Sequence, residues 1–379
     1  MSAPLNLDDP IELTRELVAI DTVNPPGDEA ACATALRGAL EAAGFQVGWH
    51  PFGERRVNLV ARVGGTPERK PICFTGHMDT VPLGAAAWRH DPFSGELADG
   101  RLYGRGTSDM KSGIAAFVVA AAGLGRRLEG TAGVELVITG GEETGCQGAV
   151  SLARQAGALG TAGAIVVAEP TANYPLVGHK GVVWLRIRVK GVTAHGSMPE
   201  QGENAIYKAA RVVAALERLE VSATAHPLMG RATLNVGTIQ GGLNINSVPD
   251  ETVITVDIRT VPDLDHAEIV DRVRQMVGPE AEVETILDVG PVFSEPGGDW
   301  IQRVFELAAA AAGERPVART VPYFTDAGAL KAAYGGPPAV ILGPGEPHMA
   351  HQTDEYCRVD RIHAAVHLYR DIIADWCDL

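Results

Sequence analysis

Cysteine is scarce in this sequence, and no two cysteines have the CxxC spacing. The chain contains 5 cysteines, an odd number, and they are scattered along its length. This pattern is typical of reduced thiols in a cytoplasm and argues against a disulfide framework. We therefore expect a cytoplasmic protein without disulfide bonds.

Long apolar segments are missing as well. The first residues, MSAPLNLDDPIELTRELVAI, lack the basic segment followed by an apolar one that marks a signal peptide. The longest apolar run, IAAFVVAAAGLG, is short, rich in alanine and flanked by charge. We therefore expect neither a signal peptide nor a membrane span.

Basic residues are outnumbered: 32 Lys and Arg stand against 47 Asp and Glu, a formal charge of −15. This excess of negative charge argues against a nucleic-acid or anionic-membrane partner. No GxxxxGK[ST] or GxGxxG segment follows a strand-like run, which argues against a nucleotide enzyme. With 46% apolar and 21% charged residues, the 379-residue chain is typical of a soluble globular protein with two domains.

Helix-like and strand-like segments alternate in the first half of the chain. Residues 31–44 have helical spacing and end at Gly44, a residue typical of a helix C-terminus. The strand-like runs are short and rich in β-branched residues, and helix-like segments such as 112–128 separate them. This order predicts an α/β sheet covered by helices on both faces. The strand-like runs are 56–63, 71–77, 133–141 and 163–168.

The middle of the chain has a different pattern. In 182–191, VVWLRIRVKG, apolar and polar side chains alternate, which predicts a sheet with one solvated face. A helix-like segment at 204–220 and strand-like segments at 232–242 and 252–262 follow. We therefore expect an α+β domain inserted into a discontinuous catalytic domain. The expected bounds are 1–179 and 293–379 for the catalytic domain and 180–292 for the insert.

Ionisable side chains follow the strand-like runs at the point where each run ends. In open α/β sheets, ligands collect at the carboxyl ends of the strands. Singly, each residue also has a structural explanation: a hydrogen-bonded histidine, a solvated glutamate pair, a turn cap at Glu169 or a helix cap at Asp109. The residues are His77, Asp79, Asp109, Glu142, Glu143, Glu169, His348 and His351.

Together these residues indicate a metal site. Carboxylates crowded at one sheet edge raise one another's pKa values unless a cation neutralises them. Imidazole and carboxylate ligands suit Zn²⁺, Mn²⁺ or Co²⁺ better than Ca²⁺. One carboxylate bridging two cations about 3.5–4 Å apart is common in hydrolytic sites.

The segments that contain these residues resemble the family of acetylornithine deacetylase, succinyl-diaminopimelate desuccinylase and carboxypeptidase G. The resemblance implies a zinc-peptidase-like catalytic domain with a mostly parallel sheet and an inserted lid or dimerisation domain. The matching segments run in family order over nearly the whole chain. They are NPPGDE, GHMDTVP, WRHDPFSGELADGRLYGRGTSDMKSG, GGEETG, AEP, VKGVTAHGSMPEQGENAI, NSVPDETVITVDIRTVPD and AHQTDEY.

The resemblance implies two divalent metal ions, zinc first, with cobalt or manganese as alternatives. Asp109 would bridge them and Glu142 would be the general base that takes a proton from water and returns it to the leaving amine. Asp79 would not bind metal but would hold His77 from behind through its carboxylate. His348 is the alternative to His351, which the AHQTDEY segment favours. The implied ligands are His77 and Glu169 for one metal and Glu143 and His351 for the other, with Asp109 shared.

The insert carries three further residues that match the family. His195 resembles a lid histidine that reaches the site of a dimer mate and donates to the developing oxyanion; otherwise it is a surface-loop histidine. Arg259 would grip a substrate carboxylate. Asn246 would contact the scissile group, unless it is a plain turn asparagine. A homodimer through the insert is implied.

The expected activity is metal-dependent hydrolysis of an N-acyl amide bond on an amino acid. The residues after His351 favour an acetylornithine deacetylase, whereas YFTDAGAL, 323–330, matches no single subfamily. Succinyl-diaminopimelate desuccinylase, and carboxypeptidase G-like or dipeptidase activity on a short peptide, are the alternatives. A non-catalytic binding protein on the same fold is expected to have lost the base or a ligand, and here all are present.

Overall fold

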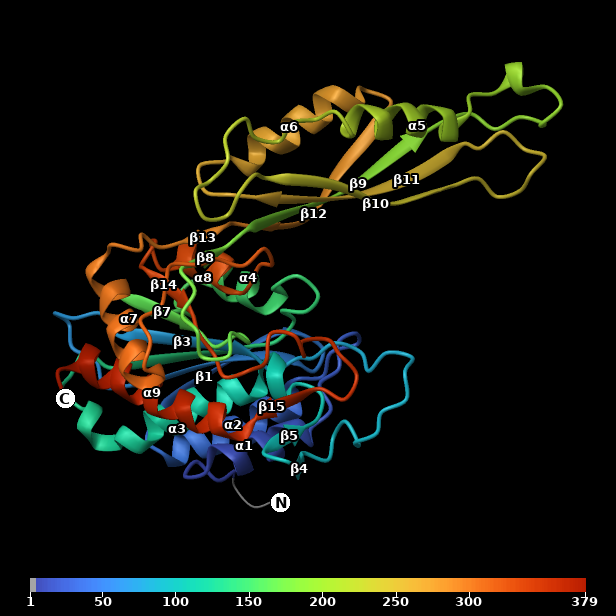
Figure 1. Cartoon of the computed structure of the whole chain (residues 1–379). Coiled ribbons are helices and arrows are strands. Elements are labelled where there is room, and N and C mark those ends of the chain that lie inside the picture. The colour runs from blue at the N-terminus through green and yellow to red at the C-terminus, as the bar shows by residue number, and fades with distance from the viewer. Residues whose placement is uncertain (1–4) are drawn as a thin grey trace. The chain divides into compact units, whose positions relative to one another are not determined.

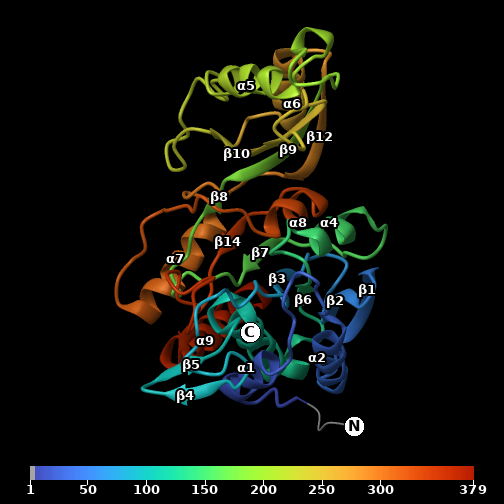
Figure 2. The same cartoon turned by 90° about the vertical axis from the view of Figure 1, so that its right-hand side faces the viewer.

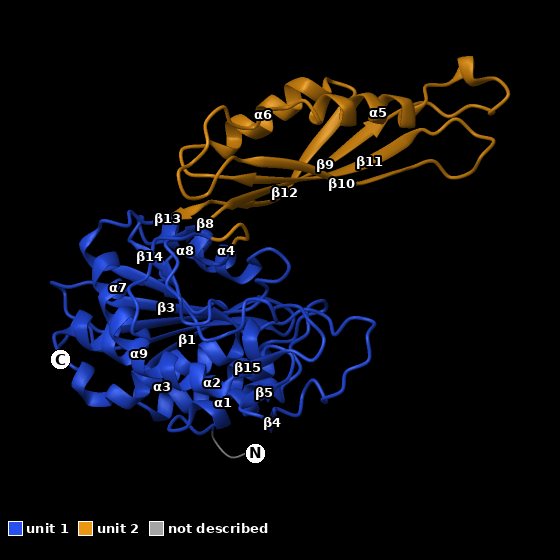
Figure 3. Cartoon of the chain, viewed as in Figure 1, with its two compact units in different colours: residues 1–178, 293–320, 325–379 blue, residues 179–292, 321–324 orange. Residues whose placement is uncertain are grey.

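The computed structural model describes residues 5–379, which form two compact units. Unit 1 comprises the chain up to 178 together with 293–320 and 325–379, and unit 2 comprises 179–292 and 321–324 (Figure 3). The predicted domain bounds assign 321–324 to the second part of the catalytic domain instead. They group with unit 2 because Lys180 N donates to Val321 O and the Phe324 ring contacts the Trp184 ring.

Unit 1 is built on a six-stranded sheet with the order β1-β2-β6-β3-β7-β14. The pairs β6–β3, β3–β7 and β7–β14 are parallel, whereas β2 is antiparallel to both of its neighbours. Every residue of the four parallel strands is buried, as expected for strands with helices on both faces. The predicted α/β fold with a mostly parallel sheet is confirmed. The strands are β1 (Gln46–Gly53), β2 (Arg56–Val63), β3 (Ile72–His77), β6 (Val134–Thr139), β7 (Ala164–Val167) and β14 (Ala339–Ile341).

Helices cover this sheet in two layers (Figures 1 and 2). α1, α3 and α9 pack together on one side with α2, and α4 and α8 pack together on the other. α3 is apolar on almost every side, which is typical of a buried helix rather than a surface one. Unit 1 contains helices α1 (Pro10–Val18), α2 (Ala30–Ala42), α3 (Ser112–Leu124), α4 (Gln147–Arg154), α7 (Asp299–Ala312), α8 (Ala327–Ala333) and α9 (Val359–Cys377).

The core of unit 1 lies between the sheet and α3 and α9. The ring of Phe74, on β3, lies 5.2 Å from that of Tyr369 and 6.1 Å from that of Phe117, measured between centroids. Fully burying one such side chain contributes about 1.5–3 kcal/mol. The sheet that ends at the ionisable residues is thus a tightly packed scaffold.

A second, three-stranded sheet brings distant parts of unit 1 together. Its order is β15-β5-β4, and Tyr356 pairs with Tyr103 in antiparallel register. The segment after His351 therefore lies beside the segment that leads to Asp109. The strands are β4 (Glu96–Ala98), β5 (Arg101–Tyr103) and β15 (Tyr356–Arg358), and a further short pair is β8 (Gly178–His179) with β13 (Val292–Phe293).

Unit 2 is a four-stranded antiparallel sheet with the order β10-β11-β9-β12, and two helices pack on one face. The predicted alternation in β9 is confirmed: Val183 and Leu185 are buried, whereas Trp184 and Arg186 are only partly so. The elements are β9 (Gly181–Lys190), α5 (Ala205–Leu216), β10 (Thr233–Gly241), β11 (Glu251–Thr260), α6 (His266–Val277) and β12 (Ala281–Val289).

Two further features are the state of the cysteines and the character of the helices. All five cysteines are buried free thiols, so the structure contains no disulfide bond. Among residues 5–379, no helix combines the length and apolar character needed to cross a bilayer.

Candidate active site

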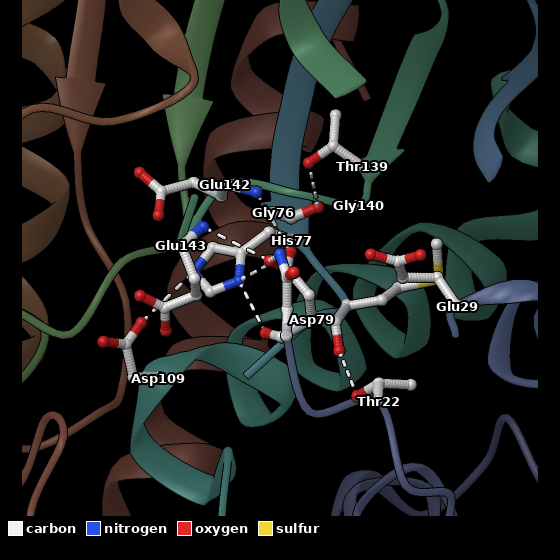
Figure 4. A network of polar contacts seen from close by, with 12 residues as sticks. Thr22, Glu29, Gly76, His77, Asp79, Asp109, Thr139, Gly140, Glu142 and Glu143 are labelled. Carbon is white, nitrogen blue, oxygen red and sulfur yellow. Dashed lines mark hydrogen bonds and ion pairs between the residues drawn. The ribbon is translucent and has the colours of Figure 1, made fainter. Parts of the chain in front are cut away.

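The ionisable residues predicted from strand ends lie together at one edge of the large sheet. His77 ends β3, Glu142 and Glu143 follow β6, and Glu169 follows β7. Because β6, β3 and β7 are adjacent and parallel, their carboxyl ends reach the same edge. Figure 4 shows His77, Glu142 and Glu143 gathered there, with Asp109 approaching from another segment.

Asp109 comes from a short irregular helix, η1 (Thr107–Lys111), just before α3. Its φ and ψ of −122° and 91° are not helical. The N-cap of α3 is Lys111, and no side chain caps that end. The helix-cap alternative for Asp109 is therefore not observed, and its carboxylate points into the site instead (Figure 4).

The carboxylate of Asp109 is shared by two clusters of possible metal ligands. On one side, His77 Nε2 lies 3.2 Å from Asp109 Oδ1 and 3.9 Å from Glu169 Oε1. On the other, His351 Nε2 lies 3.4 Å from Asp109 Oδ2 and 3.1 Å from Glu143 Oε2. In each cluster one donor atom per residue lies within 4.8 Å of the others.

The position of His351 distinguishes it from the rival His348. His348 is in neither cluster; its Nε2 lies 3.3 Å from the Tyr356 hydroxyl. His351 has a left-handed backbone with φ of 64°, which is uncommon for a residue other than glycine. Such conformations cost about 1–3 kcal/mol and concentrate at functional sites.

These clusters fit divalent metal ions. Together they contain three carboxylates and two imidazoles, the donor set that suits Zn²⁺, Co²⁺ or Mn²⁺. The side chain of Glu143 is 6% exposed, and its Oε1 is buried without a hydrogen-bond partner. A buried carboxylate oxygen of this kind is costly unless a proton or a cation satisfies it.

The pKa shifts in the metal-free clusters also favour the binding of cations. Burial raises the pKa of Glu169 well above its ordinary value, and the charge of Asp109 adds to the effect although His77 opposes it. The hydrogen bonds from His351 to Asp109 and Glu143 raise the pKa of that imidazole to about 10. Without metal, the Glu169 carboxyl and the His351 imidazole therefore hold protons more readily than usual, in place of cations.

Asp79 contacts His77 most closely through its backbone carbonyl, whereas the expected contact is through its carboxylate. The Nδ1 of His77 donates to the backbone carbonyl of Asp79, 2.9 Å away, whereas the Asp79 carboxylate is 3.6 Å from it. This contact places the ring proton on Nδ1 and directs Nε2 toward Asp109. The carboxylate instead accepts from Glu142 N at 3.1 Å, Glu143 N at 3.2 Å and Asn24 Nδ2 at 2.8 Å. Asp79 thus orients the His77 ring through its backbone carbonyl, and the Glu142–Glu143 segment through its carboxylate.

Glu142 lies beside the clusters but belongs to neither. Burial raises the pKa of its carboxyl well above the usual range; the charge of His77 opposes the shift, and Glu169 and Glu143 add to it. A carboxylate with a raised pKa that is not a ligand is suited to accept a proton. Asp326 lies nearby, where it accepts a hydrogen bond from Thr139, and burial raises its pKa to about 6.

Sequence reasoning missed three buried groups that support this site: Asn24, Asp326 and Glu355. Asn24 lies in NPPGDE and Glu355 in AHQTDEY, both within matched segments, but nothing in their spacing marks a contact with Asp79 or Asp109. Asp326 lies in YFTDAGAL, the segment that matched no subfamily.

The three residues predicted in the insert lie in unit 2. His195 and Asn246 are exposed and close together, because Gly196 N donates to Asn246 O over 2.7 Å. The Nδ1 of His195 lies 2.7 Å from Ser197 Oγ. Arg259, on β11, pairs with Asp257 at 2.9 Å, and its guanidinium lies 5.4 Å from the centre of the Phe324 ring.

Comparisons with known proteins find relatives over nearly the whole chain. The model of peptidase family M20/M25/M40 matches residues 73–375. A probable succinyl-diaminopimelate desuccinylase of Staphylococcus epidermidis is 30% identical over 404 aligned positions, covering 97% of this chain and 98% of the relative. An acetylornithine deacetylase of Myxococcus xanthus is 33% identical over 380 positions, covering 96% of each chain.

Solved structures share the fold. An M20-family metallo-carboxypeptidase of Sulfolobus solfataricus superposes with a TM-score of 0.82, covering 98% of this chain and 100% of that one. At 18% identity, this likeness shows the fold alone.

Proposed function

The chain belongs to peptidase family M20/M25/M40, a family of metal-dependent hydrolases of amide bonds, and from that premise we propose that it cleaves the N-acyl amide of an amino acid, in the manner of an acetylornithine deacetylase. The observation that carries the proposal is the carboxylate of Asp109, shared by two ligand clusters, with the non-ligand Glu142 beside them.

In this proposal His77, Asp109 and Glu169 hold one cation, and Asp109, Glu143 and His351 hold the other. Zinc is the expected metal, with cobalt or manganese as alternatives. When bound, the two cations supply Lewis acidity toward the amide carbonyl and a water molecule. Burial first, and then the charge of Asp109, raise the pKa values of Glu143 and Glu169, and the cations would offset this crowding of negative charge.

Glu142 is the proposed general base. Its carboxylate takes a proton from water and later gives it to the leaving nitrogen, which avoids the expulsion of an amide anion. Two contacts fix its position: Glu142 N donates to Asp79 Oδ1 at 3.1 Å, and Cys146 Sγ lies 3.8 Å from Glu142 Oε1. Burial raises the pKa of this carboxyl well above its usual range, which suits it to accept a proton.

The residues of unit 2 supply substrate contacts in this proposal. His195 donates to the oxyanion that develops at the carbonyl, and Arg259 binds a substrate carboxylate through two parallel hydrogen bonds. Arg259 is already oriented by Asp257 and by the Phe324 ring. Asn246, joined to the His195 turn through the Gly196 hydrogen bond, contacts the scissile group.

We propose a homodimer formed through unit 2, in which His195 acts in the partner's site. β10 is the last strand of its sheet and is mostly exposed along its length; Ile239, on that strand, is 48% exposed. An exposed edge strand with apolar side chains is a natural pairing surface for a second copy.

The substrate assay decides between this activity and its closest alternatives. Metal-loaded enzyme is offered N-acetylornithine, N-succinyl-diaminopimelate, an N-acyl-glutamate and a dipeptide, and kcat/KM is compared. We expect the highest value for N-acetylornithine. A preference for the succinyl substrate establishes a desuccinylase, an alternative favoured by a relative of that name that is 33% identical, as the acetylornithine deacetylase is.

Two other outcomes of the substrate assay would contradict the proposed activity. Comparable low rates on all substrates refute the deacetylase assignment and leave the reaction class intact. The absence of metal-dependent hydrolysis on any substrate, with no further change in Glu142→Ala, indicates a non-catalytic binding protein.

A further inference from the structure

We propose that Glu355 is a positioning residue that joins the segment 105–109 to the loop of His351 and so holds Asp109 and His351 together in one ligand cluster. The inference rests on the proposed function, because it concerns the metal pair. Glu355 lies four residues after His351, and no sequence pattern marks a role for it.

The carboxylate of Glu355 is fully buried, and four donors converge on it. Its Oε2 accepts from Arg105 Nη1 at 2.6 Å and from Gly106 N at 3.0 Å. Its Oε1 accepts from Ser108 N at 2.8 Å and from Asp109 N at 3.0 Å. Backbone N–H groups that converge in this way form an anion-binding nest, and here the anion belongs to the chain itself.

The segment needs such an acceptor because it is not a regular helix. Asp109 and Met110 have non-helical φ and ψ, and Gly106 has a left-handed φ of 87°. A Cβ at position 106 would come within 2.7 Å of Thr80 Cγ2, so the turn is closely packed as well. Buried N–H groups without a partner are costly, and Glu355 satisfies three of them at once.

Arg105 balances the charge of Glu355. Its side chain is 2% exposed, its guanidinium lies 5.1 Å from the centre of the Trp88 ring, and its Nη2 donates to Pro82 O at 3.3 Å. The charged pair is therefore fixed from several sides. A carboxylate held in this way positions the backbone of Asp109 rather than only neutralising a neighbour.

Glu355 also links two of the three possible ligands of one cluster, Asp109 and His351. His351 and Glu355 share a loop, which is tied down further where Asp354 accepts from Arg89 N at 2.7 Å. In the cluster of Asp109, Glu143 and His351, two of the three ligands lie on segments joined by Glu355. In the other cluster, His77 and Glu169 come from the ends of β3 and β7. Loss of Glu355 should therefore weaken the His351 cation more than the His77 cation.

The test is a Co²⁺ titration of the metal-free full-length protein, followed by visible absorption, on wild type and Glu355→Gln. The amide of glutamine keeps the size of the side chain but turns an NH₂ toward two of the four donors. We expect two Co²⁺ per wild-type chain. In the variant we expect one ion bound within about threefold of wild type and the second weakened about 10–100-fold, the usual effect of an outer-shell partner.

Glu135→Gln is the matched control. Glu135 is also buried in unit 1 and paired with an arginine, Arg62, but it lies in β6 and also accepts from the Tyr334 hydroxyl, away from the clusters. We expect a lower melting temperature and two Co²⁺ sites within about threefold of wild type.

The outcomes separate the inference from the proposed function. Fewer than two ions in wild type refutes both. Two ions in wild type and unchanged affinities in Glu355→Gln refute the inference alone, as does an equal loss at both sites. If circular dichroism shows that Glu355→Gln is unfolded, Glu355→Asp, which keeps the charge and shortens the reach, is titrated under the same criteria.

Discussion

Replacing Asp79 with asparagine tests whether this residue fixes the segment that carries Glu142 and Glu143. The carboxylate is fully buried and accepts three N–H groups, two from the backbone of these glutamates and one from Asn24. An asparagine has a single acceptor oxygen. If that oxygen takes the place of Oδ2, it keeps two donors and its NH₂ faces Glu142 N.

The expected loss of unfolding free energy follows from the number of hydrogen bonds that are lost or weakened. One buried backbone N–H loses its partner, which costs about 1–3 kcal/mol. Two further hydrogen bonds become neutral rather than charge-assisted, at about 0.5–1 kcal/mol each. We therefore expect metal-loaded Asp79→Asn to lose about 3 kcal/mol of unfolding free energy. We also expect kcat to fall about 10–100-fold, because Glu142 loses its backbone anchor.

Urea unfolding and steady-state kinetics measure these two quantities. Asp21→Asn is the control: Asp21 is exposed and accepts from Val23 N at 3.0 Å in a nearby loop, so we expect a change within about 0.5 kcal/mol and unchanged turnover. If Asp79→Asn is as stable and as active as wild type, the contacts to Glu142 and Glu143 do not position the site.

Three further predictions concern the reaction and the metals. Glu142→Gln should lower kcat about 10²–10⁴-fold while metal analysis still finds two ions per chain, and loss of an ion would make Glu142 a ligand. His195→Ala should lower kcat about 10²–10³-fold with full metal content, whereas loss of metal would show that His195 is a metal ligand. Metal binding at pH 7 should release protons, because hydrogen bonds to Asp109 and Glu143 raise the pKa of His351 to about 10 and a ligand imidazole must be neutral. Metal affinity should therefore rise with pH toward about 10, and calorimetry in two buffers that finds no proton release would contradict the ligand role of His351.

Most of the architecture follows from local patterns in the sequence. The alternation in 182–191 predicts a half-solvated strand because side chains alternate between the faces of a sheet. The buried apolar runs predict parallel strands, and the strand-end rule brings His77, Glu142 and Glu169 to one edge because parallel neighbours end on the same side.

The supporting contacts could not be predicted in this way. Glu355 reaches the Asp109 segment across 246 to 250 positions of chain, and no periodicity records so distant a hydrogen bond. The family resemblance implies that the Asp79 carboxylate contacts His77. β3 ends at His77, and the backbone carbonyl of Asp79 accepts from the ring while the carboxylate accepts from Glu142 N and Glu143 N.

The most direct test of the account is diffraction from zinc-loaded crystals, recorded on both sides of the zinc absorption edge. The account predicts two anomalous peaks about 3.5–4 Å apart, one on each side of the Asp109 carboxylate, with His77 on one peak and His351 on the other. A map without a peak at Asp109, or with a single peak that Asp109 does not touch, would contradict it.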